Sequence, residues 1–275
     1  MTLHPLDRAL ALKALAPGRY RAQTSPDYWN MVGPYGGSTA ATMLAAVLEH
    51  PDCLGDPVSI TVNYAAALAE GEFEVLAEPV RTNRSTQHWM LRMVQADPQS
   101  GASQVLTTAT VLTALRRETW GLSDELAPVV PAAQEVPVAA KISNVAWLDH
   151  YEVRPIAGAL PPAFDGVIHP DSVTRLWVRD RPARPLDFCS LLALSDVFYP
   201  RVWRRRALRV PAGTVSLTTH FHAGPDDLQA TGEGYLLGQA RAQAFRNGFF
   251  DQTAQLWNAS GTLLCTSNQT VYYKE

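Results

Sequence analysis

Asp196 is the residue whose type and position point most directly to chemistry. It lies three and four positions after Ala193 and Leu192, on the apolar stripe of a predicted helix, Pro185 to Phe198, and Pro200 sets the end of that helix close behind it. Burial and the negative end of the helix dipole both oppose a carboxylate there, and both would raise its pKa. A carboxyl group of raised pKa can act as a general base near neutral pH. The plain alternative is that the helix frays, so that Asp196 faces water or caps a neighbouring backbone group.

Two further polar side chains lie on predicted strands. Gln269 is on the strand Leu263 to Tyr273, on the face that carries Val271, where a buried amide would need hydrogen-bond partners. Thr214 begins the strand Thr214 to His222, a place that suits any β-branched residue. Taken alone, each fits a structural role, with Gln269 facing solvent from an edge strand.

Three other groups of residues have both a functional and a structural interpretation. The cluster from Gly33 to Gly37 either lets a ligand approach the backbone closely or is a turn before a helix. A run of arginines around Trp203 either pairs with phosphate groups or forms a solvated loop; its members are Arg201, Arg204, Arg205 and Arg206. Three aromatic residues either line a binding tunnel or pack in the core: Tyr28, Trp29 and Trp89.

Several enzyme classes are disfavoured by missing motifs. The segment from Gly36 to Ala40 lacks the last glycine of the serine hydrolase nucleophile elbow. Cys53, Cys189 and Cys265 have neither the spacing of a zinc site nor that of a disulfide framework. These patterns therefore disfavour a serine hydrolase and a zinc site.

The composition is that of a globular protein without a strong charge bias. The 23 basic and 26 acidic residues give a net charge of -3, which provides no basic field for nucleic acid. No stretch of 18 apolar residues occurs, and the N-terminus lacks the pattern of a signal peptide. These features predict a cytoplasmic protein with no nucleic-acid or membrane partner.

The two halves of the chain show the same order of elements. In the first half, a possible strand from Gly18 to Asn30 precedes a helix from Ser38 to Glu49 that is apolar nearly all round. Strands with alternating polarity follow around Val58 to Tyr64, Phe73 to Ala77, Trp89 to Met93 and Val105 to Leu112. In the second half, a strand at Arg175 to Arg179 precedes the helix before Pro200, with Asp187 as its N-cap. Four more strands follow, at Thr214 to His222, Gly234 to Phe245, Phe250 to Trp257 and Leu263 to Tyr273.

A segment rich in Pro, Ala and Val separates the halves. We therefore predict an N-terminal unit at 1–115, a linker at 116–162 and a C-terminal unit at 163–275. A helix that is apolar all round needs burial on more than one side, so each sheet must wrap its helix.

At this point the sequence resembles the acyl-CoA thioesterase II family. The resemblance covers nearly the whole chain outside the linker. In the first half it is carried by GPYGGSTAATMLA and by the stretch from SITVNYAAALAEG to VRTNRSTQHWMLRMVQ. In the second half it is carried by SVTRLWVRDRP, LLALSDVFYP, GTVSLTTHFH, FFDQTAQLWNASGTLL and SNQTVYY. It implies an α+β double hotdog, which is two tandem units that each wrap an antiparallel sheet around a long central helix.

The resemblance also implies a reaction and its residues. It indicates a homo-oligomeric enzyme that hydrolyses fatty or related acyl-CoA to the free acid and CoA, with no metal and no organic cofactor. An Asp, a Thr and a Gln activate the water in that family. The LSD motif supplies Asp196 and the SNQ motif supplies Gln269. Counting back eight residues from His222 gives Thr214, with Ser216, Thr218 and Thr219 as adjacent alternatives.

Two rival functions remain open. One is a hotdog dehydratase or hydratase acting on an acyl thioester, although Gln229 occupies the proline position of the pattern that His220 and Gly224 begin. The Asp-x-Asn motif of hotdog hydratases is absent as well. The other is a non-catalytic acyl-CoA binding module.

Internal alignment predicts one active site in each chain. It sets Thr110 opposite Gln269, Val47 opposite Asp196, and Pro57 opposite Thr214. These three residues offer no carboxylate, no amide and, at Pro57, neither a hydroxyl nor an N–H. We therefore expect the first half to serve as scaffold and tunnel wall.

Overall fold

The computed structural model describes residues 3–97, 100–141 and 144–275. Its first half contains, in order, α1 Pro5–Ala9, β1 Lys13–Ala16, β2 Arg19–Gln23, η1 Pro26–Tyr28, α2 Gly36–Leu48, β3 Asp56–Tyr64, β4 Glu72–Thr82, β5 Thr86–Ala96 and β6 Ser103–Ala114. The connecting segment holds two short 3₁₀ turns and a strand, η2 Ala133–Glu135, η3 Ala146–His150 and β7 Tyr151–Ala157.

The second half repeats this order with additions. It contains β8 Thr174–Asp180, α3 Phe188–Leu194, α4 Arg201–Arg206, β9 Ala212–Phe221, α5 Pro225–Thr231, β10 Leu236–Arg241, β11 Phe245–Arg246, β12 Phe249–Trp257 and β13 Leu263–Tyr273. The alternating strands of the sequence analysis all form, because side chains on alternate positions can be buried on the face that packs against the helices.

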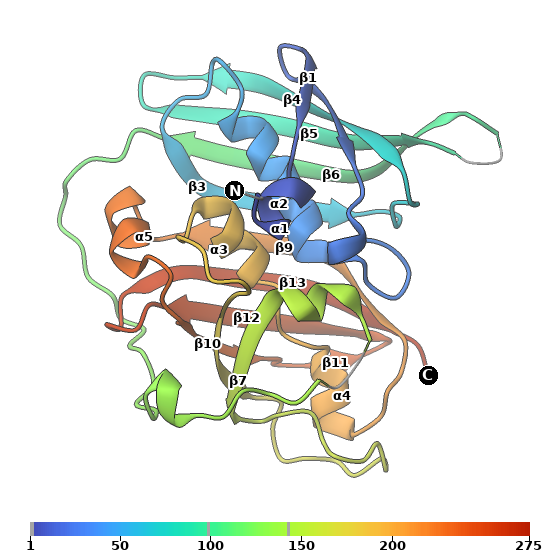
Figure 1. Cartoon of the computed structure of the whole chain (residues 1–275), viewed down its shortest axis with the longest axis vertical. Coiled ribbons are helices and arrows are strands. Elements are labelled where there is room, and N and C mark those ends of the chain that lie inside the picture. The colour runs from blue at the N-terminus through green and yellow to red at the C-terminus, as the bar shows by residue number, and fades with distance from the viewer. Residues whose placement is uncertain (1–2, 98–99, 142–143) are drawn as a thin grey trace.

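The strands form one continuous antiparallel sheet, in which the corresponding strands of the second unit follow those of the first in reverse order. Along the described chain the order is β1-β2-β4-β5-β6-β3-β9-β13-β12-β10-β8-β7, with β11 paired to β12. Figure 1 shows the first half above and the second half below, joined where β3 meets β9, with α2 and α3 on one side of the sheet. This is the architecture expected of two hotdog units fused side by side.

The pairing of β3 with β9 at the seam between the two units shows which residues of the two units correspond. Thr61 on β3 pairs with Thr218 on β9, 157 residues later, and their hydroxyl oxygens lie 3.0 Å apart. Each unit also has a break in strand register at the corresponding place, after Pro57 in β3 and after Thr214 in β9. The two halves are therefore related by an offset of 157 residues along these strands.

The two long helices meet inside the sheet. α2 buries almost every side chain, as its composition predicts, and packs against α3. The Tyr35 hydroxyl, just before α2, donates a hydrogen bond of 2.7 Å to the Ala193 carbonyl near the end of α3. The start of one helix thus lies against the end of the other.

Several predicted elements differ in length from the observed ones, and two of the differences have a local physical reason. α3 ends at Leu194 instead of Phe198. The Ser195 hydroxyl donates a hydrogen bond to the Leu192 carbonyl, and Pro200 disfavours helical geometry at the residue before it. The first strand of the prediction is observed as the shorter β2. Pro26 starts a 3₁₀ turn after it, and Gly18 lies in the hairpin turn that pairs β2 with the unpredicted strand β1.

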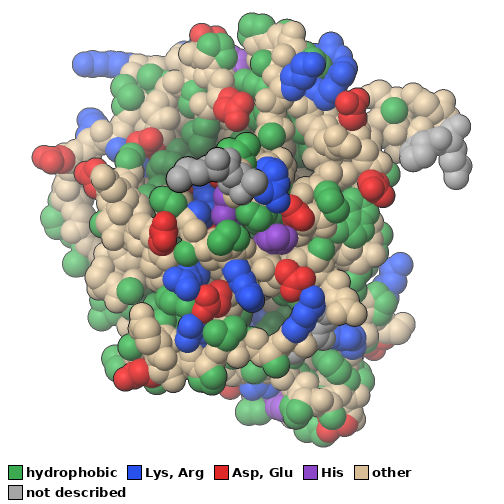
Figure 2. All heavy atoms as spheres, viewed as in Figure 1, with side chains coloured by type: hydrophobic (Ala, Val, Ile, Leu, Met, Phe, Trp, Pro, Cys, Tyr) green, Lys and Arg blue, Asp and Glu red, His purple; other side chains and the backbone are tan. Residues whose placement is uncertain are grey.

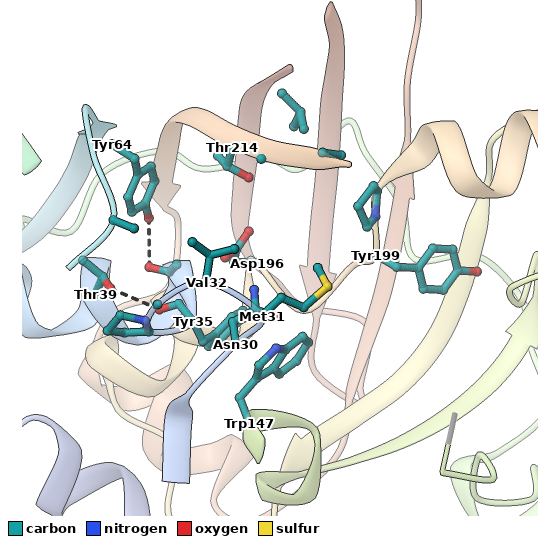
Figure 3. Close-up of a pocket in the computed structure, with 18 of the residues that line it drawn as sticks. Asn30, Met31, Val32, Tyr35, Thr39, Tyr64, Trp147, Asp196, Tyr199 and Thr214 are labelled. Atoms are coloured by element: carbon teal, nitrogen blue, oxygen red, sulfur yellow. Dashed lines mark hydrogen bonds between the residues drawn. The ribbon is translucent and has the colours of Figure 1, made fainter. Parts of the chain in front are cut away.

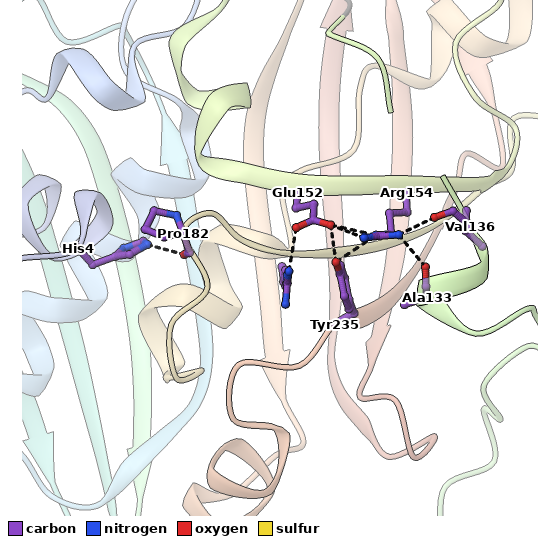
Figure 4. Close-up of polar contacts among 8 residues, drawn as sticks. His4, Ala133, Val136, Glu152, Arg154, Pro182 and Tyr235 are labelled. Carbon is purple, nitrogen blue, oxygen red and sulfur yellow. Dashed lines mark hydrogen bonds and ion pairs between the residues drawn. The ribbon is translucent and has the colours of Figure 1, made fainter. Parts of the chain in front are cut away.

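The predicted linker contributes to the sheet. β7 pairs with β8 as an edge strand. Glu152 on β7 accepts hydrogen bonds from Arg154, Arg179 and the Tyr235 hydroxyl (Figure 4). Burial opposes its charge, but these donors outweigh it and lower the pKa of Glu152 to about 2. Arg154 also donates to carbonyls of the turn at 133–136, so this part of the segment is tied to the second unit.

The visible surface carries mixed charges. Figure 2 shows Lys and Arg side chains interspersed with Asp and Glu on this face. In the part of the chain that is described, no helix is long and apolar enough to cross a membrane.

Candidate active site

A cavity of about 530 Å³ opens where the two units meet. The N-terminal unit contributes the turn before α2, the first residues of α2 and the end of β3. The C-terminal unit contributes the segment after α3, the start of β9 and the end of β13. Asp196, Thr214 and Gln269 all line it, so the structure brings the three sequence-predicted residues to one place.

Asp196 is placed differently from the sequence expectation. It does not lie on the apolar stripe of α3 but in the turn after the Ser195 C-cap, where it faces the cavity (Figure 3). Its carboxylate is directed at the start of α2, where the Gly37 N–H donates to it. The helix dipole that acts most directly on Asp196 is therefore the positive end of α2, which favours the charged form.

A chain of hydrogen bonds joins the three residues. Gln269 Nε2 donates to Asp196 Oδ1 at 2.8 Å, and the Thr214 hydroxyl donates to Gln269 Oε1 at 2.9 Å. Gln269 is 2% exposed and lies on β13 between β9 and β12, so it is not an edge residue. Since the Thr214 hydroxyl donates its one hydrogen bond to Gln269, its oxygen keeps lone pairs that can accept a hydrogen bond from a molecule in the cavity.

The pKa of Asp196 is raised strongly. Burial raises it to about 7, and the hydrogen bonds from Gln269 and the Gly37 amide act in the opposite direction without cancelling that effect. Asp196 therefore exchanges its proton near neutral pH, as a general base must.

The start of α2 approaches Asp196 closely because residues 36 and 37 are glycines. A Cβ on Gly36 would lie 2.9 Å from Asp196 Oδ2. A Cβ on Gly37 would lie 2.6 Å from the Ala193 carbonyl oxygen and equally close to the Tyr35 ring. The glycine cluster is thus a turn before a helix and also a place of close approach, which the sequence analysis had set as alternatives.

Tyr64 is a site residue that the sequence analysis treated only as an apolar strand position. It lies at the end of β3, lines the cavity and donates a hydrogen bond of 2.9 Å to the Gly36 carbonyl (Figure 3). At the offset of 157 its counterpart is Phe221, which has no hydroxyl. Only the fold could identify Tyr64, because nothing in the alternation of β3 marks it.

The three alternative residues on β9 are absent from the described cavity lining. Thr218 bonds to Thr61 across the seam, and Thr219 is buried beside the Ser195 hydroxyl at 3.2 Å. The backbone of Ser216 pairs with Asn63 and Thr270 in the sheet. Among these neighbours on β9, the hydrogen bond to Gln269 is made by Thr214.

The arginine run is structural in the described chain. Arg201 is fully buried and donates to the carbonyls of Ser172 and Tyr199, so neither a solvated loop nor a phosphate site describes it. The other three are engaged with neighbours as well: Arg204 with Asp171, Arg205 with the His169 carbonyl, and Arg206 with Glu275.

The predicted tunnel residues are not in the cavity wall. Trp89 and Tyr28 are 1% exposed and belong to the core. The described lining includes neither of them nor Trp29. The aromatic residues of the lining include Tyr35 and Trp147, whose rings stack at 4.2 Å, and Trp147 comes from the predicted linker. Over the described residues, no group of three or more His, Cys, Asp and Glu is placed to hold a metal ion.

The corresponding place in the other unit is apolar. Gln269 pairs with Leu217, and Ile60, the counterpart of Leu217, pairs with Val111, so Val111 and not Thr110 stands where Gln269 would be. Pro57 stands for Thr214, as predicted. The first residue of α3, Phe188, packs edge to face on Phe221 at 5.7 Å, whereas the first residue of α2 is Gly36 and the counterpart of Phe221 is Tyr64. Val47 is fully buried inside α2.

Two family models match the chain. One, described as the acyl-CoA thioesterase N-terminal domain, matches residues 25–114. The other, described as the acyl-CoA thioesterase C-terminal domain, matches residues 124–273. A search of curated proteins found no match.

Solved structures with the same architecture are also found. A conserved protein of unknown function with a hot dog fold from Alicyclobacillus acidocaldarius is 43% identical, with a TM-score of 0.92 over 100% of this chain and 99% of that one. An acyl-CoA thioesterase II from Mycobacterium marinum is 16% identical, with a TM-score of 0.74 over 98% of both chains. The dehydratase domain of the polyketide PpsC from Mycobacterium tuberculosis is 14% identical, with a TM-score of 0.55 over 99% of both chains. The last two similarities concern the fold alone.

Proposed function

This chain belongs to the acyl-CoA thioesterase family and is a thioester hydrolase, and from that premise we propose that it hydrolyses a fatty or related acyl-CoA to the free acid and CoA. We further propose that Asp196, Thr214 and Gln269 activate the attacking water. The observation that carries this proposal is the hydrogen-bonded chain from Thr214 through Gln269 to Asp196 on the wall of the cavity.

Each of the three residues has a defined part in the proposed mechanism. A water in the cavity donates one hydrogen to the Asp196 carboxylate and the other to the free lone pair of Thr214. Gln269 cannot reverse its amide, because one end must donate to Asp196 and the other must accept from Thr214. The water therefore presents its own lone pair to the thioester carbonyl carbon.

Attack forms a C–O bond and places negative charge on the carbonyl oxygen. The first N–H groups of α2 have no acceptor within the helix, and close approach is possible there because residue 36 is glycine. The Gly37 N–H already donates to Asp196, so we assign the oxyanion to the N–H of Gly36, which lines the cavity. When the tetrahedral intermediate collapses, the C–S bond breaks and Asp196 returns its proton to the departing thiolate, which restores the carboxylate.

The rival dehydratase reading is less well supported by the site. His220, which matched the dehydratase pattern, is exposed on β9 and is absent from the described cavity lining. A buried base at the cavity is Asp196, which suits water activation.

The test is thiol release from a panel of acyl-CoA thioesters of increasing chain length. We expect the wild-type protein to release CoA, and Asp196→Asn to lose about 10² to 10⁴-fold in turnover, since Asn accepts hydrogen bonds but not the water's proton. Addition of water to an enoyl-CoA without thiol release would favour the hydratase, and binding without either reaction would favour the binding module.

A matched control separates loss of the base from loss of any buried carboxylate. Asp180 is also buried, and burial raises its pKa to about 6 although Ser190 donates a hydrogen bond to it. It is absent from the described cavity lining. Asp180→Asn keeps an acceptor for Ser190, so we expect turnover within about twofold of wild type. Turnover above half of wild type in Asp196→Asn would show that Asp196 is not the base.

We also propose a cytoplasmic location and a homo-oligomeric state. Cys53, Cys189 and Cys265 are free thiols, which suits a reducing compartment. Light scattering of the purified protein measures the number of chains in the assembly.

A further inference from the structure

Arg209 differs from every other arginine near the cavity. It is exposed in the connection between α4 and β9, and among the described lining residues it is the only Lys or Arg. Its guanidinium lies over the Trp203 ring at 5.5 Å and over the Phe164 ring at 5.1 Å. Two aromatic rings therefore hold a positive charge at the wall of the same cavity that contains Asp196.

The charge of Arg209 has no acidic partner within the described residues, whereas its neighbours Arg204 and Arg206 are paired with Asp171 and Glu275. Stacking uses the faces of the guanidinium and leaves its edge, with the N–H donors, free. A planar edge of this kind binds the oxygens of a phosphate group with two parallel hydrogen bonds.

The cavity extends to both sides of Asp196. Figure 3 shows Tyr64 and Thr39 on one side and Tyr199 on the other. The Tyr64 side continues into the apolar segment from Ala65 to Leu68 and carries no Lys or Arg among the described residues. Trp203, on which Arg209 stacks, also lines the cavity and belongs to the cluster of buried residues against which Tyr199 packs, so Arg209 belongs to the Tyr199 side.

An acyl-CoA likewise has one uncharged end and one charged end. One side of the thioester is an uncharged acyl group, and the other is a long arm that ends in phosphates. We infer that Arg209 is the anion subsite for the CoA phosphates, so that the CoA arm leaves Asp196 along the Tyr199 side and the acyl group occupies the Tyr64 side. This inference rests on the proposed function, because it assumes that the thioester is a CoA ester.

The test compares two thioesters of one acyl group, the CoA ester and the pantetheine ester, which lacks the phosphates. For Arg209→Gln we expect KM for the CoA ester to rise about tenfold with kcat unchanged, since one charge-assisted contact is lost in the ground state and the transition state alike. The kinetics of the pantetheine ester should not change. Arg209→Lys should recover part of the affinity, because it keeps the charge but not the planar fork.

Arg206→Gln is the matched control. It removes the same charge from the same region at a residue paired with Glu275 and outside the described lining, and we expect less than a twofold change in KM. An equal loss for both esters in Arg209→Gln, or no loss for either, would overturn the inference.

Calorimetric titration with free CoA makes the test independent of hydrolysis. Arg209→Gln should weaken CoA binding about tenfold, and added salt should weaken binding to the wild type more than to the variant. If no acyl-CoA is hydrolysed, the proposed function fails while this titration still decides the role of Arg209. CoA binding of equal strength in the wild type and in the variant would refute the subsite.

Discussion

At the scale of single residues, Asp196 is held in an environment that opposes the charge its proposed role requires. Burial raises its pKa to about 7, so the charged base predominates only above neutral pH. We predict that kcat/KM falls about tenfold for each pH unit below 7 and is flat above it. A pH-rate profile of the wild type with one acyl-CoA checks this. A profile flat from pH 5 to pH 8 would contradict it.

The same pKa also predicts how stability depends on pH. A carboxyl group whose pKa is raised by folding holds a proton that the unfolded chain has already lost, so its contribution to stability declines as pH rises from about 4 to about 7. Asp196→Asn removes this cost, which is a few kcal/mol at most. Urea unfolding at pH 8 should therefore find the variant at least as stable as the wild type. A variant clearly less stable than wild type at pH 8 would mean that the neighbours stabilise the charge more than burial opposes it.

Thr214 and Thr218 provide a matched pair on one strand. Thr214→Ala should lower kcat by about tenfold, because the water loses an acceptor and Gln269 loses the donor that orients it. Thr214→Ser should restore most of the rate. Thr218→Ala should stay within about twofold of wild type, since its hydroxyl bonds to Thr61 away from the cavity. The reverse pattern in steady-state kinetics would show that Thr218, and not Thr214, is the catalytic threonine.

At the scale of elements, the site depends on the contact between the start of α2 and the end of α3. A methyl group at residue 36 meets the mobile end of the Asp196 side chain, whereas one at residue 37 meets the Ala193 backbone and the Tyr35 ring. We predict that Gly36→Ala lowers kcat more than tenfold with little change in stability. Gly37→Ala should instead destabilise the fold by about 1 to 3 kcal/mol. Thermal unfolding and kinetics of the two variants measure both effects, and equal losses of stability would contradict the distinction.

The elements themselves were largely predictable from local patterns. Alternation in segments such as Val58 to Tyr64 marks strands because each strand has one buried face, and Asp187 was correctly predicted as the N-cap of α3, where it accepts from the Ser190 N–H. β1 was missed, since its four residues are all exposed and carry no alternation. The end of α3 was misplaced, because the apolar spacing that continues to Phe198 does not reveal the hydrogen bond from the Ser195 hydroxyl to the Leu192 carbonyl.

The candidate site was predictable only in part. Asp196, Thr214 and Gln269 came from motifs, and the structure places them in one hydrogen-bonded chain. Tyr64 and Arg209 were missed, because their positions at the cavity arise from pairing between β3 and β9 and from packing on Trp203. No local pattern reports which strands pair or which aromatic rings a side chain will stack on.

At the scale of the whole molecule, the two units are similar in fold but different in chemistry. Where the C-terminal unit has Gln269 and Thr214, the N-terminal unit has Val111 and Pro57. We predict that a non-hydrolysable acyl-CoA analogue binds with a stoichiometry of one per chain in calorimetry. Two sites per chain, each lost through substitutions in its own unit, would contradict this.

The aromatic pair of Phe188 and Phe221 has a consequence for the history of such a chain. A dimer of identical units must keep the polar groups of its site twice, and each copy carries the cost of a carboxylate held in an apolar setting. Once two units are joined in one chain they mutate separately, so one copy can exchange its site for packed rings while the other keeps the chemistry. Fusion thereby relieves the trade-off between activity and stability, because one half of the molecule is freed to stabilise the other.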